Sequence, residues 1–267
     1  MNKKIVAGLF IAAAFTGATA NANAASASVW DSAQPEIFSK SQTGFNDVPF
    51  QQYVQKEGLA IANSGQFKLD ISKLNLKYDH NVSIFFINEG AGYRNQLAYT
   101  SKGATKQEGL LFKDISCTGT GCANDWGGEA LKFGDGVKMG TIKGGSQIDF
   151  QLRANGLNRG TDSYIFGTQA AQNADGLQHV VAYAIENTPY LLMGFEDLYG
   201  TGGTDQGKFG EKSDRDFNDT VFVVDIGMKN AKDFMGKDVP EPSVVLSLVG
   251  LGTAAALKLR RRNGGNV

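Results

Sequence analysis

Apolar and polar residues alternate along short segments of this chain, and glycine, asparagine or aspartate separates one segment from the next. Ile148, Phe150 and Leu152 alternate with polar neighbours, for example, and Val221 begins a run of β-branched and aromatic residues. A period of two places successive side chains on opposite faces of a strand, whereas a helix needs a period near 3.6. The pattern therefore predicts an all-β domain, an antiparallel β-sandwich or jelly roll.

The expected strands share this alternation or a β-branched composition, and they lie at 67–72, 74–78, 82–87, 96–100, 110–115, 148–152, 164–166, 180–185, 190–195 and 221–226. Glycine supplies 34 of the 267 residues and marks many of the turns between them. A helix is expected only at 50–62, where Phe50, Tyr53 and Val54 share one face before Gly58 interrupts the pattern.

The first residues have the composition of a secretory signal peptide. Two lysines precede an apolar run at 5–15, and small residues follow. We expect a signal peptide helix over 1–24, cut by signal peptidase between Ala24 and Ala25, and a single folded domain over 25–239. Cleavage after Ala20, Ala22 or Ala27 is an alternative, and a buried N-terminal helix of a cytosolic protein is the other interpretation.

The last residues, 240–267, combine three features in the order of a membrane-sorting tail. Pro240, Glu241 and Pro242 come first, an apolar segment follows at 244–257, and basic residues end it at 258–262. The apolar segment is shorter than the roughly 20 residues that span a bilayer, and the basic residues should stay on the cytoplasmic side. We expect a hydrophobic sorting helix that anchors the exported chain transiently in the inner membrane; an ordinary C-terminal anchor is the alternative.

This tail resembles the PEP-CTERM sorting signal of Gram-negative bacteria, with which it shares the sequence VPEPS at 239–243. The resemblance implies an exosortase as processing partner, cleavage near the Pro-Glu-Pro motif, and release to the cell surface or the extracellular space. Loss of 1–24 and of the residues after Pro242 removes six of 26 basic and none of 27 acidic residues, a mature net charge of −7. Such a surface argues against nucleic acid or anionic lipid as a partner and is compatible with cations.

Two cysteines, Cys117 and Cys122, bracket the sequence Thr-Gly-Thr-Gly. In an exported protein this spacing favours a local disulfide that closes a glycine-rich loop. A metal site would need more Cys or His than His80 and His179 supply, and the spacing is not the C-x-x-C of redox proteins. We therefore expect a structural disulfide.

Acidic residues gather at the ends of the last two expected strands, which a glycine-rich loop joins. Carboxylates brought together in this way repel one another unless a counter-ion neutralises them, and oxygen ligands in a flexible loop suit Ca²⁺. The expected ligands are Glu196, Asp197, Asp214, Asp216, Asn218 and Asp219, with Asp175 as a weaker candidate.

The spacing also limits this hypothesis. Asp214, Asp216 and Asn218 are spaced like the start of an EF-hand loop, but Asp219 stands where that loop needs glycine. Glu196 and Asp197 are adjacent on a strand, so only one of them is expected to face the site. The alternative is a loop of solvated acids that cap turns or pair with nearby basic residues.

The sequences GFEDL at 194–198 and SDRDFNDTVF at 213–222 together resemble the signature of the family called domain of unknown function 4114. The resemblance covers about 150–226, and DGLQH at 175–179 resembles a segment just upstream in that family. It implies a β-sandwich module of exported surface and matrix proteins, with Ca²⁺ as the ligand of the acidic motif, and it implies no reaction. Residues 25–147 resemble no family that we recognise.

Three classes of function remain open. We expect a non-catalytic module of the cell surface or extracellular matrix, associated with biofilm or exopolysaccharide and stabilised by Ca²⁺. A lectin-like, glycan-binding module is the alternative, with Trp126 as a candidate contact for sugars, although Trp126 fits a buried core position equally well. A glycan-active hydrolase is a remote alternative: Glu196 and Asp216 offer a carboxylate pair, but no other catalytic motif appears and His179 has no evident triad partner.

Overall fold

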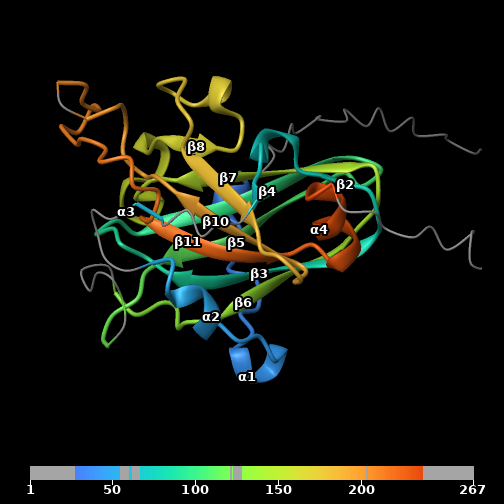
Figure 1. Ribbon diagram of the computed structural model, residues 1–267. Helices are drawn as coiled ribbons and strands as arrows, with labels where there is room; N and C mark the ends of the chain where they lie inside the picture. Colours follow the sequence, from blue (N-terminus) through green and yellow to red (C-terminus); the bar gives the residue numbers. More distant parts are fainter. Residues whose placement is uncertain are drawn as a thin grey trace, which may run out of the picture.

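Two antiparallel β-sheets lie face to face in the computed structural model, which describes residues 28–54, 60–61, 67–120, 122, 128–202 and 204–236 (Figure 1). The strands are β1 (Phe67–Lys68), β2 (Asn75–Leu76), β3 (His80–Asn88), β4 (Asn95–Gly103), β5 (Gln107–Ile115), β6 (Gly136–Ile142), β7 (Ser146–Arg153), β8 (Ile165–Gly167), β9 (Val180–Ala184), β10 (Tyr190–Phe195) and β11 (Thr220–Asp225). The signal peptide with its Ala24–Ala25 cleavage site, Trp126 and the sorting tail lie outside the described residues.

Short helices and turns connect and cover the sheets. They are η1 (Val29–Asp31), α1 (Lys40–Thr43), α2 (Val48–Gln51), η2 (Ile71–Lys73), α3 (Gly156–Arg159), η3 (Gly160–Asp162), η4 (Ala170–Gln172) and α4 (Met228–Phe234). Within the part of the chain that the structure describes, no helix has the length and apolar character needed to cross a membrane.

All strand pairs are antiparallel, which confirms the predicted all-β sandwich. One sheet has the order β1-β9-β10-β11-β3-β6, and the other has the order β2-β7-β4-β5, with β8 paired to β7. The β10–β11 register places Phe195 opposite Thr220. The acidic residues that follow β10 therefore come close to those that precede β11.

The core between the sheets is rich in fully buried phenylalanine, including Phe86, Phe112 and Phe222. A second apolar cluster lies on the other face of the six-stranded sheet, where Phe45 stacks on Phe85 with ring centroids 4.0 Å apart. Strands β9, β10 and β11 are consequently buried on both faces, which explains their nearly continuous apolar sequences.

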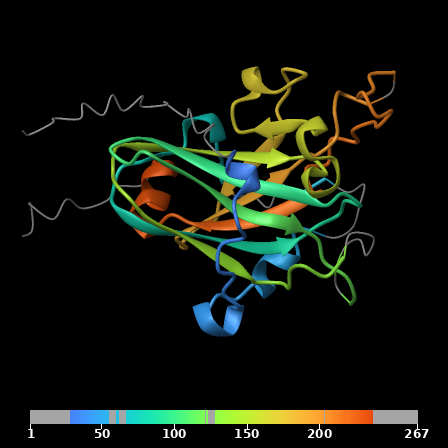
Figure 2. The same cartoon turned by 180° about the vertical axis from the view of Figure 1, so that it is seen from behind.

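The N-terminal segment covers this second face by crossing from one sheet to the other. It begins with Trp30 packed against Ala98 and Leu110 on the four-stranded path β2-β7-β4-β5. Phe38 then bridges to Gly136 at the edge strand β6, and α2 contacts β3. The segment, blue in Figure 2, can be followed across the strands in that view.

The predicted strand at 67–72 is wrong beyond Lys68. The Asp70 carboxylate accepts a hydrogen bond from the Ser72 N–H at 3.2 Å, and this local bond turns the chain into η2. The strand expected at 74–78 shortens to β2.

Strand β6 was not expected, because glycines interrupt its pattern. A Cβ at Gly136 would lie 2.5 Å from the Phe85 ring, so only glycine fits beside β3 at that position.

The helix expected at 50–62 is also wrong over its described residues. Helix α2 ends at Gln51, and the Tyr53 and Val54 N–H groups bond to carbonyls three residues back, as in a tighter 3₁₀ turn. The apolar face expected for this helix nevertheless predicted which side chains are buried, because Phe50 and Val54 both belong to the second cluster. Helix α4 had no counterpart in the sequence analysis.

The structure joins Cys117 to Cys122 by a disulfide, with a Cα–Cα distance of 6.1 Å. Cys117 is buried against the core between the sheets, and its N–H donates a hydrogen bond to the Glu89 carboxylate at 3.1 Å. The bridge therefore fastens the start of the following loop to the sandwich.

Candidate metal centre

The acidic segments meet where β10 ends and β11 begins, at the base of the long loop between them (orange in Figure 1). Glu196 directly follows β10, and its N–H donates to the His179 carbonyl at 2.9 Å, which prolongs the β9–β10 pairing. Asp216 precedes β11 by four residues, and its carbonyl accepts from the Ile61 N–H at 3.1 Å.

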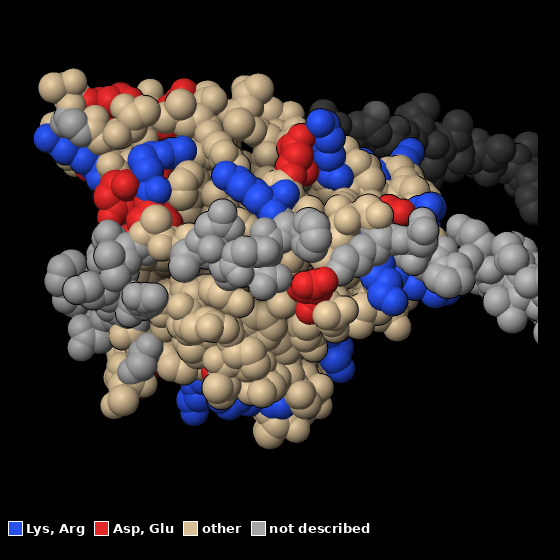
Figure 3. Space-filling model, viewed as in Figure 1, with Lys and Arg blue, Asp and Glu red and all other residues tan. Residues whose placement is uncertain are grey.

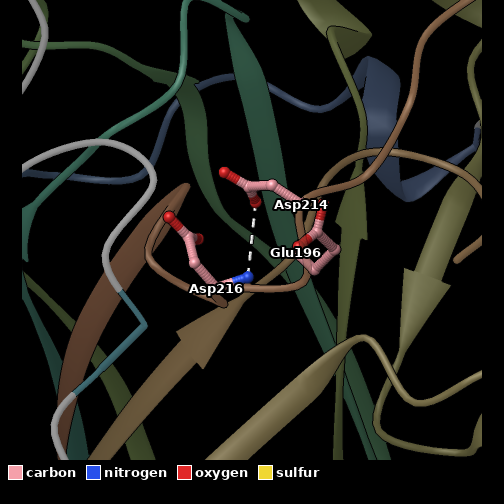
Figure 4. Close-up of side chains that lie close together, drawn as sticks. All are labelled: Glu196, Asp214 and Asp216. Atoms are coloured by element: carbon pink, nitrogen blue, oxygen red, sulfur yellow. Dashed lines mark hydrogen bonds between the residues drawn. The ribbon is translucent and has the colours of Figure 1, made fainter. Parts of the chain in front are cut away.

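Three of the expected ligands come together here: Glu196, Asp214 and Asp216 (Figure 4). Each offers one carboxylate oxygen, and these oxygens all lie within 4.8 Å of one another. Ca²⁺ binds oxygen at 2.3–2.6 Å, so two ligands on opposite sides of one ion are about 5 Å apart. The spacing of the three oxygens is therefore compatible with a shared ion.

Local hydrogen bonds to the backbone fix the positions of the two aspartate side chains. The Asp216 N–H donates to Asp214 Oδ1 at 3.3 Å, and Asp216 Oδ1 accepts from the Asn218 N–H at 2.9 Å. Arg215 and Phe217 have φ values of 62° and 63°, a conformation that costs roughly 1–3 kcal/mol per non-glycine residue. A strained backbone conformation of this kind persists only where the surrounding contacts hold it in place.

Glu196 and Asp216 are both buried, whereas Asp214 is exposed. The Glu196 side chain is 0% exposed, and within the described residues neither carboxylate oxygen has a hydrogen-bond partner. Burial raises the pKa of Glu196 to about 7, and the charges of Asp214 and Asp216 add to this increase. The Ser213 hydroxyl and the positive charge of Arg215 oppose this increase in the pKa. A buried carboxylate without a donor is costly unless a cation approaches it.

Asp197 and Asp219 lie apart from these three acids. Asp197 Oδ2 accepts from Asn95 Nδ2 at 2.6 Å, and the Asp197 N–H donates to Asp219 Oδ2 at 2.7 Å. Both residues line a pocket beside Tyr93, and Glu196 is not among the residues that line it. Asn218 is fully buried, and its N–H donates to Asp216 Oδ1; its expected role as a ligand stays a prediction.

Asp175 positions the loop and is also separate from the group. Its Oδ2 accepts from the Gly200 N–H at 2.8 Å and is hydrogen-bonded to His179 Nε2 at 2.8 Å. Burial works against its ionisation, but hydrogen bonds from Gly200, Leu177 and His179 hold the pKa of Asp175 below its usual range.

His179 links Asp175 to the backbone of Glu196. Its Nδ1 bonds to the Glu196 carbonyl at 2.9 Å, and its ring stacks on Phe166 with centroids 3.7 Å apart. This role is that of a structural histidine, as its lack of an evident triad partner suggests, and the only sequence signal for its contact with Asp175 is the DGLQH segment that contains both residues.

The surface around the loop carries charges of both signs (Figure 3). Exposed Asp205, Lys208 and Lys212 lie on the loop, and Figure 3 shows acidic and basic side chains intermingled at that end of the molecule. Arg215 donates from Nη2 to the Gln178 carbonyl, and its guanidinium lies 4.8 Å from the Phe217 ring centroid. These contacts hold the Arg215 side chain against the protein, beside Asp214 and Asp216.

Comparison with known families agrees with the two resemblances. Residues 142–227 match the family model of the domain of unknown function DUF4114, and residues 238–262 match the PEP-CTERM protein-sorting motif. The first match contains β7 to β11 and all three clustered acids. No curated protein and no solved structure matches the chain. The chain therefore carries a DUF4114 domain followed by a PEP-CTERM sorting motif, and it is an exported, exosortase-sorted protein.

Proposed function

We propose that the mature protein is a non-catalytic module of the cell surface or extracellular matrix whose sandwich is stabilised by Ca²⁺. Glu196, Asp214 and Asp216 bind the ion, and backbone carbonyls and water complete its shell. The observation that carries this proposal is the Glu196 carboxylate, which is fully buried, meets the geometric criteria for no hydrogen bond among the described residues, and has an oxygen within 4.8 Å of oxygens of Asp214 and Asp216.

The chemistry of the group favours a hard cation. All three side chains offer oxygen, and none of the group is Cys or His, the ligands that zinc and copper sites prefer. Mg²⁺ usually keeps several waters in a strict octahedron, whereas Ca²⁺ accepts more protein oxygens in flexible geometry. A fully buried glutamate beside a glycine-rich loop suits the second arrangement.

Burial also favours a ligand role over a catalytic one. Glycoside hydrolysis needs two carboxyl groups that flank a sugar in a cleft. Glu196 is 0% exposed, so a glycan would not reach it without a rearrangement of the loop. A stabilising ion, in contrast, needs only the oxygens that already converge.

Calorimetric titration of Ca²⁺ into chelator-treated mature protein tests the site. We expect saturable binding to the unaltered protein, and loss of binding in Glu196→Gln and Asp216→Asn. Glu108→Gln is the matched control, because Glu108 is an exposed acid on β5 outside the group. If both site variants still bind Ca²⁺, or if no protein binds it, the three acids do not form a Ca²⁺ site.

The variant Asp197→Asn tests whether the neighbouring acids also bind the ion. Asp197 is hydrogen-bonded to Asn95 and Asp219 and is not part of the group of three. We expect this variant to lose stability and to keep its Ca²⁺ affinity within about threefold, a free-energy change below 1 kcal/mol. Loss of Ca²⁺ binding in a folded Asp197→Asn protein would contradict the assignment of ligands.

A further inference from the structure

A separate pocket of about 120 Å³ lies on the outer face of the four-stranded path β2-β7-β4-β5. Ile148, Phe150 and Leu152 of β7 pack in the core between the sheets, so the alternating residues Asp149 and Gln151 face outward. Residues from β4, β7, β8 and the segment containing η4 line the pocket, and those used below are Thr100, Lys102, Asp149, Gln151, Ile165 and Gln172. None of them is among the three clustered acids.

Asp149 lies at the centre of this lining. It is 5% exposed and faces Thr100 across the β4–β7 pair. Its Oδ1 accepts three hydrogen bonds, from Gln147 at 3.2 Å, Thr168 at 3.2 Å and Gln169 at 2.7 Å. Its Oδ2 accepts none from the described residues, and the Lys102 ammonium is 3.9 Å away. The carboxylate is thus held rigidly by one oxygen while the other keeps its hydrogen-bonding capacity.

The other polar groups of the pocket are similarly available. The side chains of Thr100, Gln151 and Gln172 make no hydrogen bond with the part of the chain that the structure describes. A hydroxyl and two amides both donate and accept, Lys102 donates, and Asp149 Oδ2 accepts. Ile165, 41% exposed, adds an apolar surface at the rim.

We propose that this pocket binds one hexose residue of a neutral glycan. Vicinal hydroxyls need donors and acceptors close together, and the CH face of a sugar needs an apolar contact; the lining offers both. A single carboxylate beside a single ammonium leaves the pocket without net charge, which favours a neutral ligand over a uronic acid. The volume is about four times that of a liquid water, so the pocket exceeds a site for one structural water.

The proposal is independent of the Ca²⁺ site, because the two sites share no residue. Binding of the glycan should persist in chelator wherever the protein stays folded. A failure of the Ca²⁺ titration would leave this proposal standing, and a failure of glycan binding would leave the Ca²⁺ site standing.

Nuclear magnetic resonance titration of the mature protein tests the pocket. The probes are the methyl glycosides of glucose, galactose and mannose, with methyl glucuronate as the charged comparison. We expect at least one neutral glycoside to cause saturable shifts of the Thr100, Gln151, Thr168 and Gln169 amides with millimolar affinity, and methyl glucuronate to cause none.

Two small substitutions locate the binding. Thr100→Val and Gln151→Ala remove groups that make no hydrogen bond within the described structure, so both variants should melt like the unaltered protein. Each should weaken binding roughly threefold to tenfold, the value of one hydrogen bond. Gln206→Ala, at an exposed loop glutamine, is the control and should bind normally. Absence of saturable shifts with every neutral glycoside, equal binding by the variants, or binding of methyl glucuronate alone would overturn the proposal.

Discussion

The backbone of Glu196 is fixed on both sides by hydrogen bonds to His179. Its N–H donates to the His179 carbonyl, and its own carbonyl bonds to His179 Nδ1, each at 2.9 Å. His179 is held in turn by Asp175 and by the Phe166 ring. At the residue scale, the fold therefore holds a carboxylate where only protonation or a cation can neutralise it.

The pKa of Glu196 predicts how stability depends on pH without metal. Its folded-state pKa of about 7 lies above the ordinary value of 4.5. The stabilising contribution of its protonated form is therefore complete below pH 4.5 and is lost as the pH rises through about 7. The loss is on the order of 3 kcal/mol at most.

Urea unfolding in chelator, from pH 4.5 to 8, measures this loss as the difference between the unaltered protein and Glu196→Gln. Carboxylates with lowered pKa values, such as Asp175, change stability with pH in the opposite direction. Their contribution is present in both proteins and therefore cancels in the difference. A difference curve that stays flat over this range would contradict the burial of an ionisable Glu196.

Elements of regular pattern were predictable from the sequence, and elements shaped by single contacts were not. Strands β3, β10 and β11 appeared within two residues of expectation, because β-branched and aromatic runs dominate them. The sequence does not show that a side chain such as Asp70 will bond to its own backbone, or that Gly136 must fit against a ring. For the acids, strand alternation separated Glu196 from Asp197, but only the folded loop selects Asp214 and Asp216.

Gly194 lets β10 pack closely against the segment that contains Asp216. A Cβ at this position would lie 2.3 Å from the Phe217 carbonyl oxygen and 2.2 Å from Ile61 Cδ1. We expect Gly194→Ala to destabilise the protein by about 1–3 kcal/mol and to weaken Ca²⁺ binding, since Phe217 adjoins Asp216.

Chemical denaturation and the Ca²⁺ titration measure these two effects. Gly109→Ala is the matched strand control, because a Cβ there would lie 3.0 Å from its nearest neighbour, Tyr99 Cε1, rather than 2.2 Å. A Gly194→Ala protein as stable as Gly109→Ala would show that the close approach is not required.

At the scale of the whole molecule, the sandwich needs more than the matched family region. Strand β11 pairs with β3, and β7 pairs with β4, so both sheets join residues inside 142–227 to residues before it. The three clustered acids are contributed by the matched region, while the N-terminal segment packs on the outer face of the six-stranded sheet. The DUF4114 region is thus one part of a larger β-sandwich in this chain.

The sorting motif predicts the mass of the mature protein. We expect export to remove the signal peptide and the residues after about Pro242, which leaves a chain with a net charge of −7 from 20 basic and 27 acidic residues. Intact-mass measurement of protein recovered from the cell surface or medium checks this. A recovered chain that still carries Arg260, Arg261 and Arg262 would contradict processing by an exosortase.

Thermal unfolding of the mature protein in excess Ca²⁺ and in chelator tests the central claim most directly. At a hundredfold excess over Kd, an ion that binds only the folded state adds about 2.7 kcal/mol, or roughly 5–10 °C in Tm for a domain of this size. We predict that shift for the unaltered protein and for Glu108→Gln, and its loss in Glu196→Gln. Superimposable melting curves of the unaltered protein in Ca²⁺ and in chelator would contradict a stabilising ion at Glu196, Asp214 and Asp216.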